Sequence, residues 1–567
     1  MVKNIHGLIK MNTKKELTLE ETFKLAYQKH KKNDFKEAEN LYTKILKIDP
    51  EHFETIFLWG SLLLQINNFS KAKQLLSRAA IINPKHAETY NNLGIVLKKL
   101  GERKKAINCF FKAIEVNSKH PQAHHNLGTA YRELGKFMDA KKYYQKAIKI
   151  KPNYANAYIN LGTVFKELEE RDKAMNCYIK AIEIQPSLSY AHSNLGTIYK
   201  ELGELEKAIS CYTKATKSEP ENLDHHYLLS EFNEEILDSD LKKLIIRLMK
   251  NVNCTKQNHA FGNYLLSKYE KKSKNYKKEL DYLIKGHQYY FETNREKFEL
   301  QVKFFLNRLP KNKELNNTKK LNDTFIKGND EINPIYIIGV PRCGSTLIEK
   351  VIVSGTKYVP IGEETIIINS VVEEKLNLKQ SLDSDMENFK KKIINKYKQK
   401  GLISKNYDCI FTDKSLSNFF YIPLIKKIFH NAKIINCKRN PLSSIMSIFQ
   451  SNLISIGWAH NLENIFKYFD IYYRTIDSFK KVFPNYIYEL EYEKFVNHPE
   501  KESKKLMKFC ALPWDKKCLE YYKRKDIFSQ TASNIQIRKP IYKHSLDKYL
   551  PYKQFLDKYG KKYSWFN

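Results

Sequence analysis

Residues 334–346 read PIYIIGVPRCGST, and this stretch decides the fold of the C-terminal part of the chain. Its first half is a run of β-branched and aromatic residues, which is typical of a buried strand. The run ends at Gly339, and a short loop closed by Gly344 precedes an apolar segment. A strand, a glycine-bounded loop and a helix in this order predict a phosphate-binding turn, because backbone N–H groups at a helix N-terminus attract anions.

The loop differs at one position from the loop of proteins that hydrolyse nucleoside triphosphates. The spacing Gly339-x-x-x-x-Gly344-Ser345-Thr346 reproduces their frame, but Ser345 stands where they keep a lysine. That lysine contacts the β- and γ-phosphates and the next hydroxyl holds Mg²⁺, so a kinase is disfavoured. Backbone amides with Arg342 and the two hydroxyls suit a smaller anion that needs no metal. The alternative is a glycine turn before a buried helix.

The motif Pro-Arg-Cys-Gly-Ser-Thr resembles the 5′-phosphosulfate loop of sulfotransferases, in the form found in protein-tyrosine sulfotransferases. The resemblance covers residues 332–567 and implies an α/β, P-loop-like domain with a central parallel sheet. It also implies the donor 3′-phosphoadenosine-5′-phosphosulfate (PAPS) as co-substrate. The loop residues that would bind this donor are Arg342, Cys343, Gly344, Ser345 and Thr346.

The same resemblance implies a second anion site about a hundred residues further on. Residues 432–441, AKIINCKRNP, are predicted to form a strand that leads into a basic turn. Arg439 lies in the turn, and Ser447 follows eight positions later on the expected helix. A guanidinium and a hydroxyl placed in this way suit the 3′-phosphate of the donor. Arg-Asn-Pro alone would indicate only a surface turn.

The resemblance also implies the catalytic groups. Residues 360–365, PIGEET, are similar to a Cys-Gly-Glu-Glu-Thr segment whose first glutamate is the general base, here Glu363. Residues 411–416, FTDKSL, place a catalytic lysine at Lys414. Sulfuryl transfer needs a base for the acceptor proton and cations for the charge that develops, so Arg342 joins Lys414 in the second role. The neighbouring Glu364 remains an alternative base.

Two more segments complete the comparison. Residues 487–499, IYELEYEKFVNHP, resemble the segment that closes the nucleotide pocket, which makes Tyr492 a donor-contact residue. Residues 531–542, TASNIQIRKPIY, resemble a lid over the 3′-phosphate, with Ser533 and Lys539 as contacts. No group of histidines, cysteines or acids has metal-ligand spacing, so we expect no metal.

The N-terminal part of the chain has a 34-residue repeat. Asn-Leu-Gly recurs at residues 92–94, 126–128, 160–162 and 194–196, with alanines and prolines in register. Each unit reads as two amphipathic helices closed by proline. The pattern resembles the tetratricopeptide repeat and covers residues 20–223 in about six units, after a tail at residues 1–19. Such units stack into a superhelix with a concave groove, so we expect a polypeptide partner.

The repeated asparagines are candidates for contact with that polypeptide. An amide side chain donates and accepts hydrogen bonds at once, so a ladder of amides could hold an extended peptide. The alternative is a packing position that tolerates asparagine. The four residues are Asn92, Asn126, Asn160 and Asn194.

Composition limits the remaining choices. The chain has 567 residues, 98 Lys and Arg against 63 Asp and Glu, and a formal charge of +35. Nine cysteines without a CxxC pair indicate reduced thiols. No signal peptide and no membrane span is expected, which predicts a soluble, cytoplasmic protein. The positive charge does not identify a partner by itself. We expect no nucleic acid and regard acidic stretches around substrate tyrosines as one use of the charge.

The sequence as a whole therefore predicts a PAPS-dependent sulfotransferase. A repeat array would present the acceptor, and helices at residues 224–331 would form a bridge. Residues 332–567 would transfer sulfate to a hydroxyl, with protein tyrosine as the leading acceptor. Sulfation of a carbohydrate or small metabolite is the second interpretation. A non-catalytic repeat scaffold with a nucleotide-binding domain is the third. The sequence leaves the oligomeric state open, with a homodimer among the options.

Overall fold

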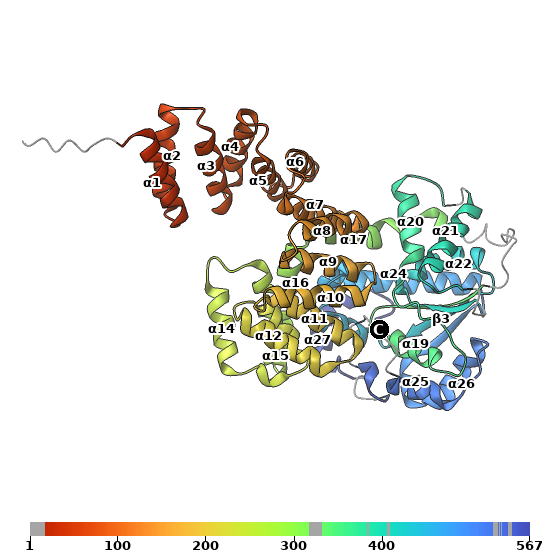
Figure 1. The fold of residues 1–567 in the computed structure, drawn as a ribbon. Helices are drawn as coiled ribbons and strands as arrows, with labels where there is room; N and C mark the ends of the chain where they lie inside the picture. The colour runs from red at the N-terminus through yellow and green to blue at the C-terminus, as the bar shows by residue number, and fades with distance from the viewer. Residues whose placement is uncertain are drawn as a thin grey trace, which may run out of the picture. The chain divides into compact units, whose positions relative to one another are not determined.

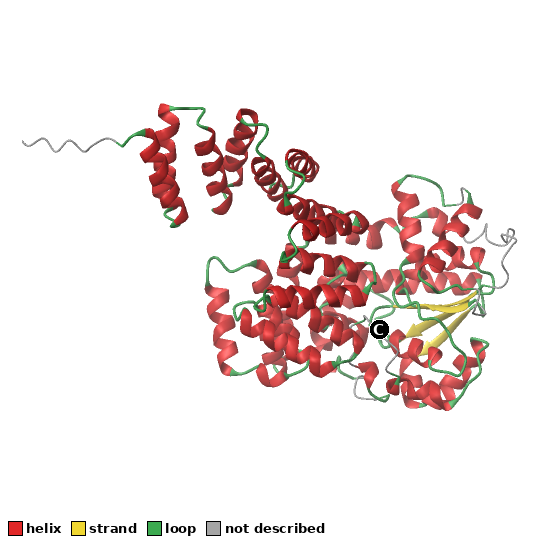
Figure 2. Ribbon diagram, in the orientation of Figure 1, coloured by secondary structure: helices red, strands yellow, loops and turns green. Residues whose placement is uncertain are grey.

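The structure is a computed structural model that describes residues 17–316, 332–382, 385–404, 409–524, 531, 533, 536–541 and 547–566. The chain divides into two compact units, Met1–Leu195 and Gly196–Asn567. Helices make up the first unit, and the second unit adds a small sheet (Figure 2). Within the described residues, no helix is both long and apolar enough to cross a bilayer.

Helices α1 to α12 form six consecutive pairs, as the repeat pattern predicts (Figure 1). The helices are α1 (Leu19–Lys31), α2 (Phe35–Ile48), α3 (Phe53–Gln65), α4 (Phe69–Ile82), α5 (Ala87–Lys99), α6 (Arg103–Val116), α7 (Pro121–Glu133), α8 (Phe137–Ile150), α9 (Ala155–Glu167), α10 (Arg171–Ile184), α11 (Ser189–Leu202) and α12 (Leu205–Ser218).

The glycine of each repeat allows close packing of the two helices in a pair. A Cβ added at Gly94 would lie 2.5 Å from the ring of Phe110, and one added at Gly162 would lie 2.7 Å from the ring of Tyr178. These contacts are shorter than van der Waals distances, so only glycine fits opposite the large ring. The repeated pattern of small and large residues therefore fixes how the helices of each pair approach.

A helical bridge follows the array. It consists of α13 (Leu223–Ser230), η1 (Glu234–Ile236), α14 (Ser239–Lys250), α15 (Lys256–Lys272), α16 (Tyr276–Thr293), α17 (Arg295–Lys303), η2 (Phe304–Arg308) and α18 (Lys313–Asn316). The sequence predicts this segment as separate from the α/β domain, but one continuous hydrophobic core runs from Leu223 in α13 to Leu556 near the C-terminus. The bridge and the α/β domain thus fold as one compact unit, because they share a core.

A four-stranded parallel sheet lies at the centre of the α/β domain, in the order β2-β1-β3-β4. The residues of the central strands are buried and mostly apolar, and helices of the domain cover both faces of the sheet (Figure 1). The elements are β1 (Asn333–Gly339), α19 (Ser345–Val353), α20 (Ile367–Asn377), α21 (Met386–Gln399), β2 (Ile410–Asp413), η4 (Leu416–Tyr421), α22 (Ile422–Ile428), β3 (Lys433–Lys438), α23 (Pro441–Gln450), η5 (Gly457–His460), α24 (Leu462–Val482), β4 (Ile487–Glu491), α25 (Tyr492–Asn497), α26 (Pro499–Phe509), η6 (Lys516–Lys523), η7 (Gln536–Arg538), η8 (Leu550–Tyr552) and α27 (Lys553–Gly560).

The strand order creates a switch point between β1 and β3. The chain leaves β1 toward β2 on one side, and it leaves β3 toward β4 on the other. In open parallel sheets, ligands bind at the carboxyl ends of the strands next to such a switch point. The loops after Gly339 and Lys438 lie there, and they are the two predicted anion-binding turns.

Buried polar contacts connect bridge helix α16 to α23. The carboxylate of Glu279 accepts hydrogen bonds from Gln450 Nε2 at 2.9 Å and from the Tyr552 hydroxyl at 2.6 Å. His287 donates from Nε2 to the carbonyl oxygen of Phe449 at 2.7 Å. Because Gln450 and Phe449 end α23, the bridge holds the helix that carries one of the predicted donor contacts.

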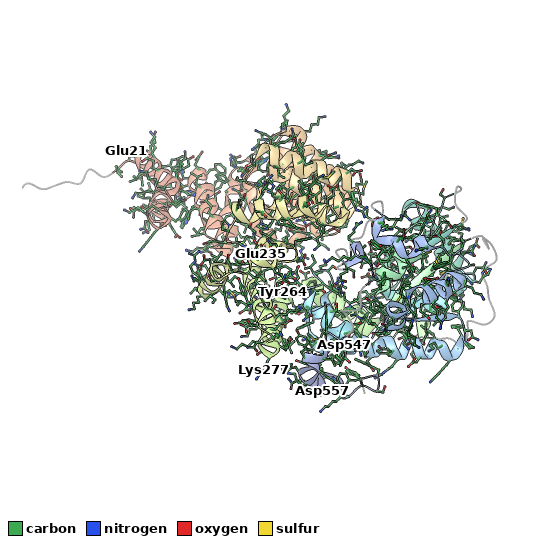
Figure 3. The ribbon with its side chains drawn as sticks, turned by 90° about the horizontal axis from the view of Figure 1, so that it is seen from below. Glu21, Glu235, Tyr264, Lys277, Asp547 and Asp557 are labelled. Atoms are coloured by element: carbon green, nitrogen blue, oxygen red, sulfur yellow. The ribbon has the colours of Figure 1, made fainter. Side chains whose placement is uncertain are left out.

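A second histidine extends this connection. The Nδ1 atoms of His287 and His460 lie 2.9 Å apart, and the Tyr264 hydroxyl lies 3.1 Å from His287 Nδ1. Tyr264, labelled in Figure 3, is a buried residue of bridge helix α15. Burial lowers the pKa of His287 to about 4 and that of His460 to about 2, where the nearby His287 adds to the effect. Both rings are therefore neutral at pH 7.

We expect a fall in pH to destabilise the folded chain through these two histidines. An unfolded histidine binds its proton near pH 6.5, whereas His287 and His460 stay neutral until well below that pH in the folded chain. The folded state therefore loses stability as the pH falls from about 6.5 toward 4, by roughly 1–2 kcal/mol per histidine at pH 5. Calorimetric unfolding of the full chain between pH 7 and pH 5 measures this loss.

His460→Phe tests whether the histidines cause this loss of stability. The change removes one proton-binding site and keeps an aromatic ring at the position where the His460 ring now stacks on Phe298, with ring centroids 4.9 Å apart. The pH dependence should become shallower in this variant. The exposed His498, changed to Gln, is the control and should leave the slope unaltered. Equal slopes in His460→Phe and the unaltered chain would contradict the assignment.

Candidate active site

The loop after β1 has a backbone that is shaped for an anion. Arg342 has a φ of 68° and Gly344 a φ of 98°, both in the left-handed region. Gly344 is the N-cap of α19, and a glycine has no side chain with which to cap this helix end. A Cβ at Gly344 would lie 2.3 Å from the Tyr492 ring, so glycine is required. The first N–H groups of α19 thus lack intrahelical acceptors, and anion binding by this turn stays a prediction.

The turn after β3 lies against this loop. Arg439 donates from Nη1 to the carbonyl oxygen of Arg342 at 3.0 Å, and its guanidinium lies 4.9 Å from the centre of the Tyr492 ring. Arg342 donates from Nε to Ser447 Oγ at 2.9 Å. The carboxyl ends of β1, β3 and β4 therefore bring together four residues that the sequence predicts for donor binding.

Residues near the C-terminus complete this cluster. Arg342 donates from Nη1 to Ser533 Oγ at 2.8 Å and from Nη2 to Gln536 Oε1 at 3.3 Å. Lys539 is exposed, and its carbonyl oxygen accepts a hydrogen bond from the Tyr521 hydroxyl at 3.1 Å. Ser533, a predicted donor contact, thus lies beside Arg342. For Lys539, the described contact is made by its backbone with Tyr521 and not with Arg342. Gln536 was missed, since a glutamine in a loop carries no distinctive signal.

A second cluster forms at the end of β2. Lys414 Nζ lies 3.0 Å from Glu363 Oε1, and the two side chains are only 2% and 5% exposed. Lys414 also donates to Thr346 Oγ1 at 3.4 Å, and this hydroxyl lies 3.2 Å from Thr531 Oγ1. Thr346 in the phosphate loop therefore lies between the Glu363–Lys414 pair and the C-terminal segment.

Backbone pairing holds Glu363 next to Lys414. The N–H of Thr412 donates to Pro360 O at 3.0 Å, and the N–H of Lys414 donates to Gly362 O at 2.9 Å. The segment thus continues the sheet beside the end of β2, with a bridge between Glu363 and Lys414. A Cβ at Gly362 would lie 2.0 Å from Thr412 O, so this approach requires glycine.

Electrostatics keep Lys414 charged. Burial disfavours the ammonium, but the carboxylates of Glu363, Glu349 and Glu364 outweigh burial and raise the pKa of Lys414. Of the two predicted base candidates, Glu363 makes the hydrogen bond to Lys414, and Glu364 is exposed. A buried lysine that stays protonated can stabilise negative charge on a reacting group.

The described side-chain contacts of Arg342 are with the 3′-phosphate candidates Ser447 and Ser533, together with Gln536. The structure thus groups Arg342 with donor binding, and its catalytic role stays a prediction. Cys343 and Ser345 are buried in the loop, and the N–H of Cys343 donates to the carbonyl oxygen of Val340 at 3.2 Å, so direct donor contact by these two residues stays a prediction.

Asp413 is a buried carboxylate that organises the second cluster. It accepts hydrogen bonds from Thr365 Oγ1 at 2.7 Å, Tyr397 OH at 2.5 Å, the Ser415 N–H at 2.9 Å and Asn418 Nδ2 at 3.2 Å. Its four donors come from segments on either side of Lys414 and after Glu363. Sequence reasoning missed this role because an Asp beside a catalytic candidate gives no sign of its burial.

Three of the four asparagines of the predicted ladder have described side-chain hydrogen bonds in the first unit. Asn92 donates from Nδ2 to Ser61 Oγ at 3.1 Å, Asn126 donates from Nδ2 to Asn91 Oδ1 at 2.8 Å, and Asn160 Nδ2 lies 2.8 Å from His125 Nε2. These bonds connect neighbouring repeats. Each amide keeps further hydrogen-bonding capacity, and Asn194 is half-buried, so peptide contact stays a prediction for all four.

We expect Asp413→Asn to loosen the Lys414 segment, because an amide nitrogen cannot accept the hydrogen bonds that one carboxylate oxygen now receives. Hydrogen exchange of peptides that cover residues 410–421 should become roughly ten times faster or more, since an opening cost of about 1–3 kcal/mol is lost. The exposed Asp477→Asn in α24 is the matched control and should leave exchange in this segment unaltered. Unchanged exchange in Asp413→Asn would contradict the organising role.

Both parts of the chain match models of known protein families. Residues 334–516 match the model of a sulfotransferase family. Models of the tetratricopeptide repeat match residues 30–93, 87–120, 121–154, 164–203 and 189–222.

Two curated relatives cover different shares of the chain. An uncharacterized protein of Aquifex aeolicus (strain VF5) is 29% identical over 315 residues, which are 53% of this chain and 41% of the relative. Protein-tyrosine sulfotransferase 1 of Danio rerio is 27% identical over 221 residues, which are 34% of this chain and 57% of the relative. The chain thus spans about half the length of the curated relatives it matches.

Solved structures of repeat proteins are similar to a third of the chain. MamA is 30% identical, with a TM-score of 0.27, over 29% of this chain and 95% of MamA. YrrB, described as a TPR protein with an unusual peptide-binding site, is 22% identical, with a TM-score of 0.28, over 33% of this chain and 96% of YrrB. The family models are the decisive comparison, and they show that the chain combines tetratricopeptide repeats with a sulfotransferase-family domain.

Proposed function

We propose that the chain is a sulfotransferase that moves the sulfuryl group of PAPS to a hydroxyl acceptor. The observation that carries the proposal is the pairing of two sites at one edge of the sheet. A phosphate loop with Arg342, Arg439 and Ser447 lies at the switch point, and the buried pair of Glu363 and Lys414 lies next to it. Such an arrangement suits a donor with anions at two positions.

The residues present fit the donor. The loop from Arg342 to Thr346 offers backbone N–H groups at a helix N-terminus, which suits the 5′-phosphosulfate. Arg439, with Ser447 and Arg342, offers charge-assisted hydrogen bonds for the 3′-phosphate. Tyr492, whose ring packs on Gly344 and Arg439, suits contact with the nucleoside. Ser533 belongs to the same cluster through Arg342.

The second cluster supplies the chemistry. Glu363 accepts the proton of the acceptor hydroxyl as the new oxygen–sulfur bond forms. The bond between sulfur and the bridging phosphate oxygen breaks, and Lys414 stabilises the charge that develops on that oxygen. Thr346, already hydrogen-bonded to Lys414, places the ammonium beside the phosphate loop. Positioning and fixed charge thus do most of the catalytic work.

Protein tyrosine is the acceptor we favour. The similarity to a protein-tyrosine sulfotransferase supports it. Tetratricopeptide repeats support a polypeptide acceptor, because stacked repeats offer extended binding surfaces. The charge of +35 favours acidic sequence around the tyrosine.

We expect Glu363→Gln and Lys414→Met each to reduce transfer of labelled sulfate from PAPS by about 10²- to 10⁴-fold, the usual range for loss of an acid or base. Glu363→Gln should still bind 3′-phosphoadenosine-5′-phosphate, because Glu363 acts on the acceptor, whereas Lys414→Met should bind it more weakly, because Lys414 lies beside the phosphate loop through Thr346. The exposed ion pair of Glu387 and Lys391, 3.0 Å apart, provides matched controls in Glu387→Gln and Lys391→Met, which should keep full activity.

The location of the label decides the acceptor. Label in a tyrosine-containing acidic polypeptide supports the proposal, whereas label only in a carbohydrate or small-molecule fraction supports the second interpretation. An unaltered chain that transfers sulfate to no acceptor, and binds 3′-phosphoadenosine-5′-phosphate no better than AMP, contradicts the enzyme proposal. Tight nucleotide binding without any transfer would indicate the non-catalytic scaffold.

A further inference from the structure

Glu349 is a buried carboxylate beneath the proposed active site. It lies in α19, three residues after Thr346, and its exposure is 0%. Its Oε1 accepts a hydrogen bond from Thr412 Oγ1 at 2.9 Å. Its Oε2 has no hydrogen-bond donor in the described part of the chain, and Lys350 Nζ lies 3.7 Å away. A carboxylate removed from water is costly, so the chain is expected to retain it for a purpose other than stability.

Thr412 connects this carboxylate to the segment of the proposed base. Its hydroxyl donates to Glu349 and accepts a hydrogen bond from the N–H of Gly362 at 3.1 Å. The same hydroxyl lies 3.4 Å from Pro360 O, a longer distance, and donation of its single proton to Glu349 leaves its lone pairs for the N–H of Gly362. The N–H of Gly362 belongs to the peptide just before the one that joins Gly362 to Glu363, so this hydroxyl helps to hold the turn that carries the proposed base.

Glu349 also acts on Lys414 through charge. Burial opposes the charged form of Lys414, and the carboxylate of Glu349 is the second largest of the influences, after Glu363, that raise its pKa. Burial raises the pKa of Glu349 in turn, while Lys350 and Lys414 oppose this rise. The carboxylates of Glu349 and Glu363 thus both act through charge on the ammonium of Lys414, and they also act on each other.

We propose that Glu349 is a positioning residue for the transfer reaction. Its carboxylate orients the Gly362–Glu363 turn through Thr412. Together with Glu363, it also attracts the ammonium of Lys414. Glu349 lies one helical turn beyond the phosphate loop and acts on the reaction only through these groups. This inference rests on the proposed function, since its main readout is turnover.

Glu349→Gln tests the charge. The amide oxygen can still accept the hydrogen bond from Thr412, so the change removes mainly the negative charge. We expect kcat to fall by roughly 10- to 100-fold, the cost of a misplaced catalytic group, while the Kd for 3′-phosphoadenosine-5′-phosphate stays within about threefold. The acidic limb of the kcat/KM profile should move to lower pH, because loss of a neighbouring negative charge eases ionisation of Glu363.

Two further changes separate charge from orientation. Thr412→Val removes the hydroxyl but leaves both charges, so it should lower kcat and leave the acidic limb in place. Thr412→Ser restores the hydroxyl and should recover most of the rate. Glu374→Gln is the matched control, because Glu374 is half exposed in an ion pair with Lys392. It should retain the rate and pH profile of the unaltered chain.

Failure of this inference and failure of the proposed function are distinguishable. A Glu349→Gln chain with unaltered rate and acidic limb overturns the positioning role, while activity of the unaltered chain stands. Loss of nucleotide binding together with rate in Glu349→Gln would overturn it as well, since that outcome indicates a purely structural residue. Absence of turnover in the unaltered chain contradicts the proposed function, and the inference with it.

Discussion

The ion pair between Lys414 and Glu363 is almost completely removed from water, and the candidate active site is built around this constraint. Removing two charges from water costs several kcal/mol per ion unless further contacts compensate. The surrounding groups provide them: the Thr346 hydroxyl accepts a hydrogen bond from Lys414, and the carboxylate of Glu349 adds a second negative charge. The surroundings of this pair therefore depend in part on α19, which carries both Thr346 and Glu349 and begins at the phosphate loop.

The two clusters of the site follow from the topology of the sheet. Arg342 follows β1 and Arg439 follows β3, and these two adjacent strands flank the switch point. Lys414 follows β2, which pairs with the other edge of β1. A parallel sheet places all of these ends at one edge, so residues up to a hundred positions apart in the chain meet without any long loop.

The motifs made of contiguous residues were predictable from the sequence, because their chemistry depends on local spacing. Gly339 and Gly344 predict the loop after the strand, and the conformation of Gly344 against Tyr492 gives the physical reason. The role of Asp413 was not predictable, since it depends on donors up to 48 residues away. The partners of Arg342 likewise come from 105 and 191 residues further along the chain. The bridge and the α/β domain share one hydrophobic core, and the helical periodicity of the bridge sequence did not indicate this.

The shared core has a consequence for how the site is maintained. α23 carries Ser447 three residues before Gln450, and Gln450 donates to Glu279 of the bridge. His287, also in the bridge, binds the carbonyl oxygen of Phe449 in the same turn. A helix held at its C-terminal end in this way keeps Ser447 at the correct position for Arg342, because the intervening turn is rigid. The bridge is thus part of the framework of the donor-binding cluster, and an α/β domain that begins at β1 would lack two of the contacts that fix α23.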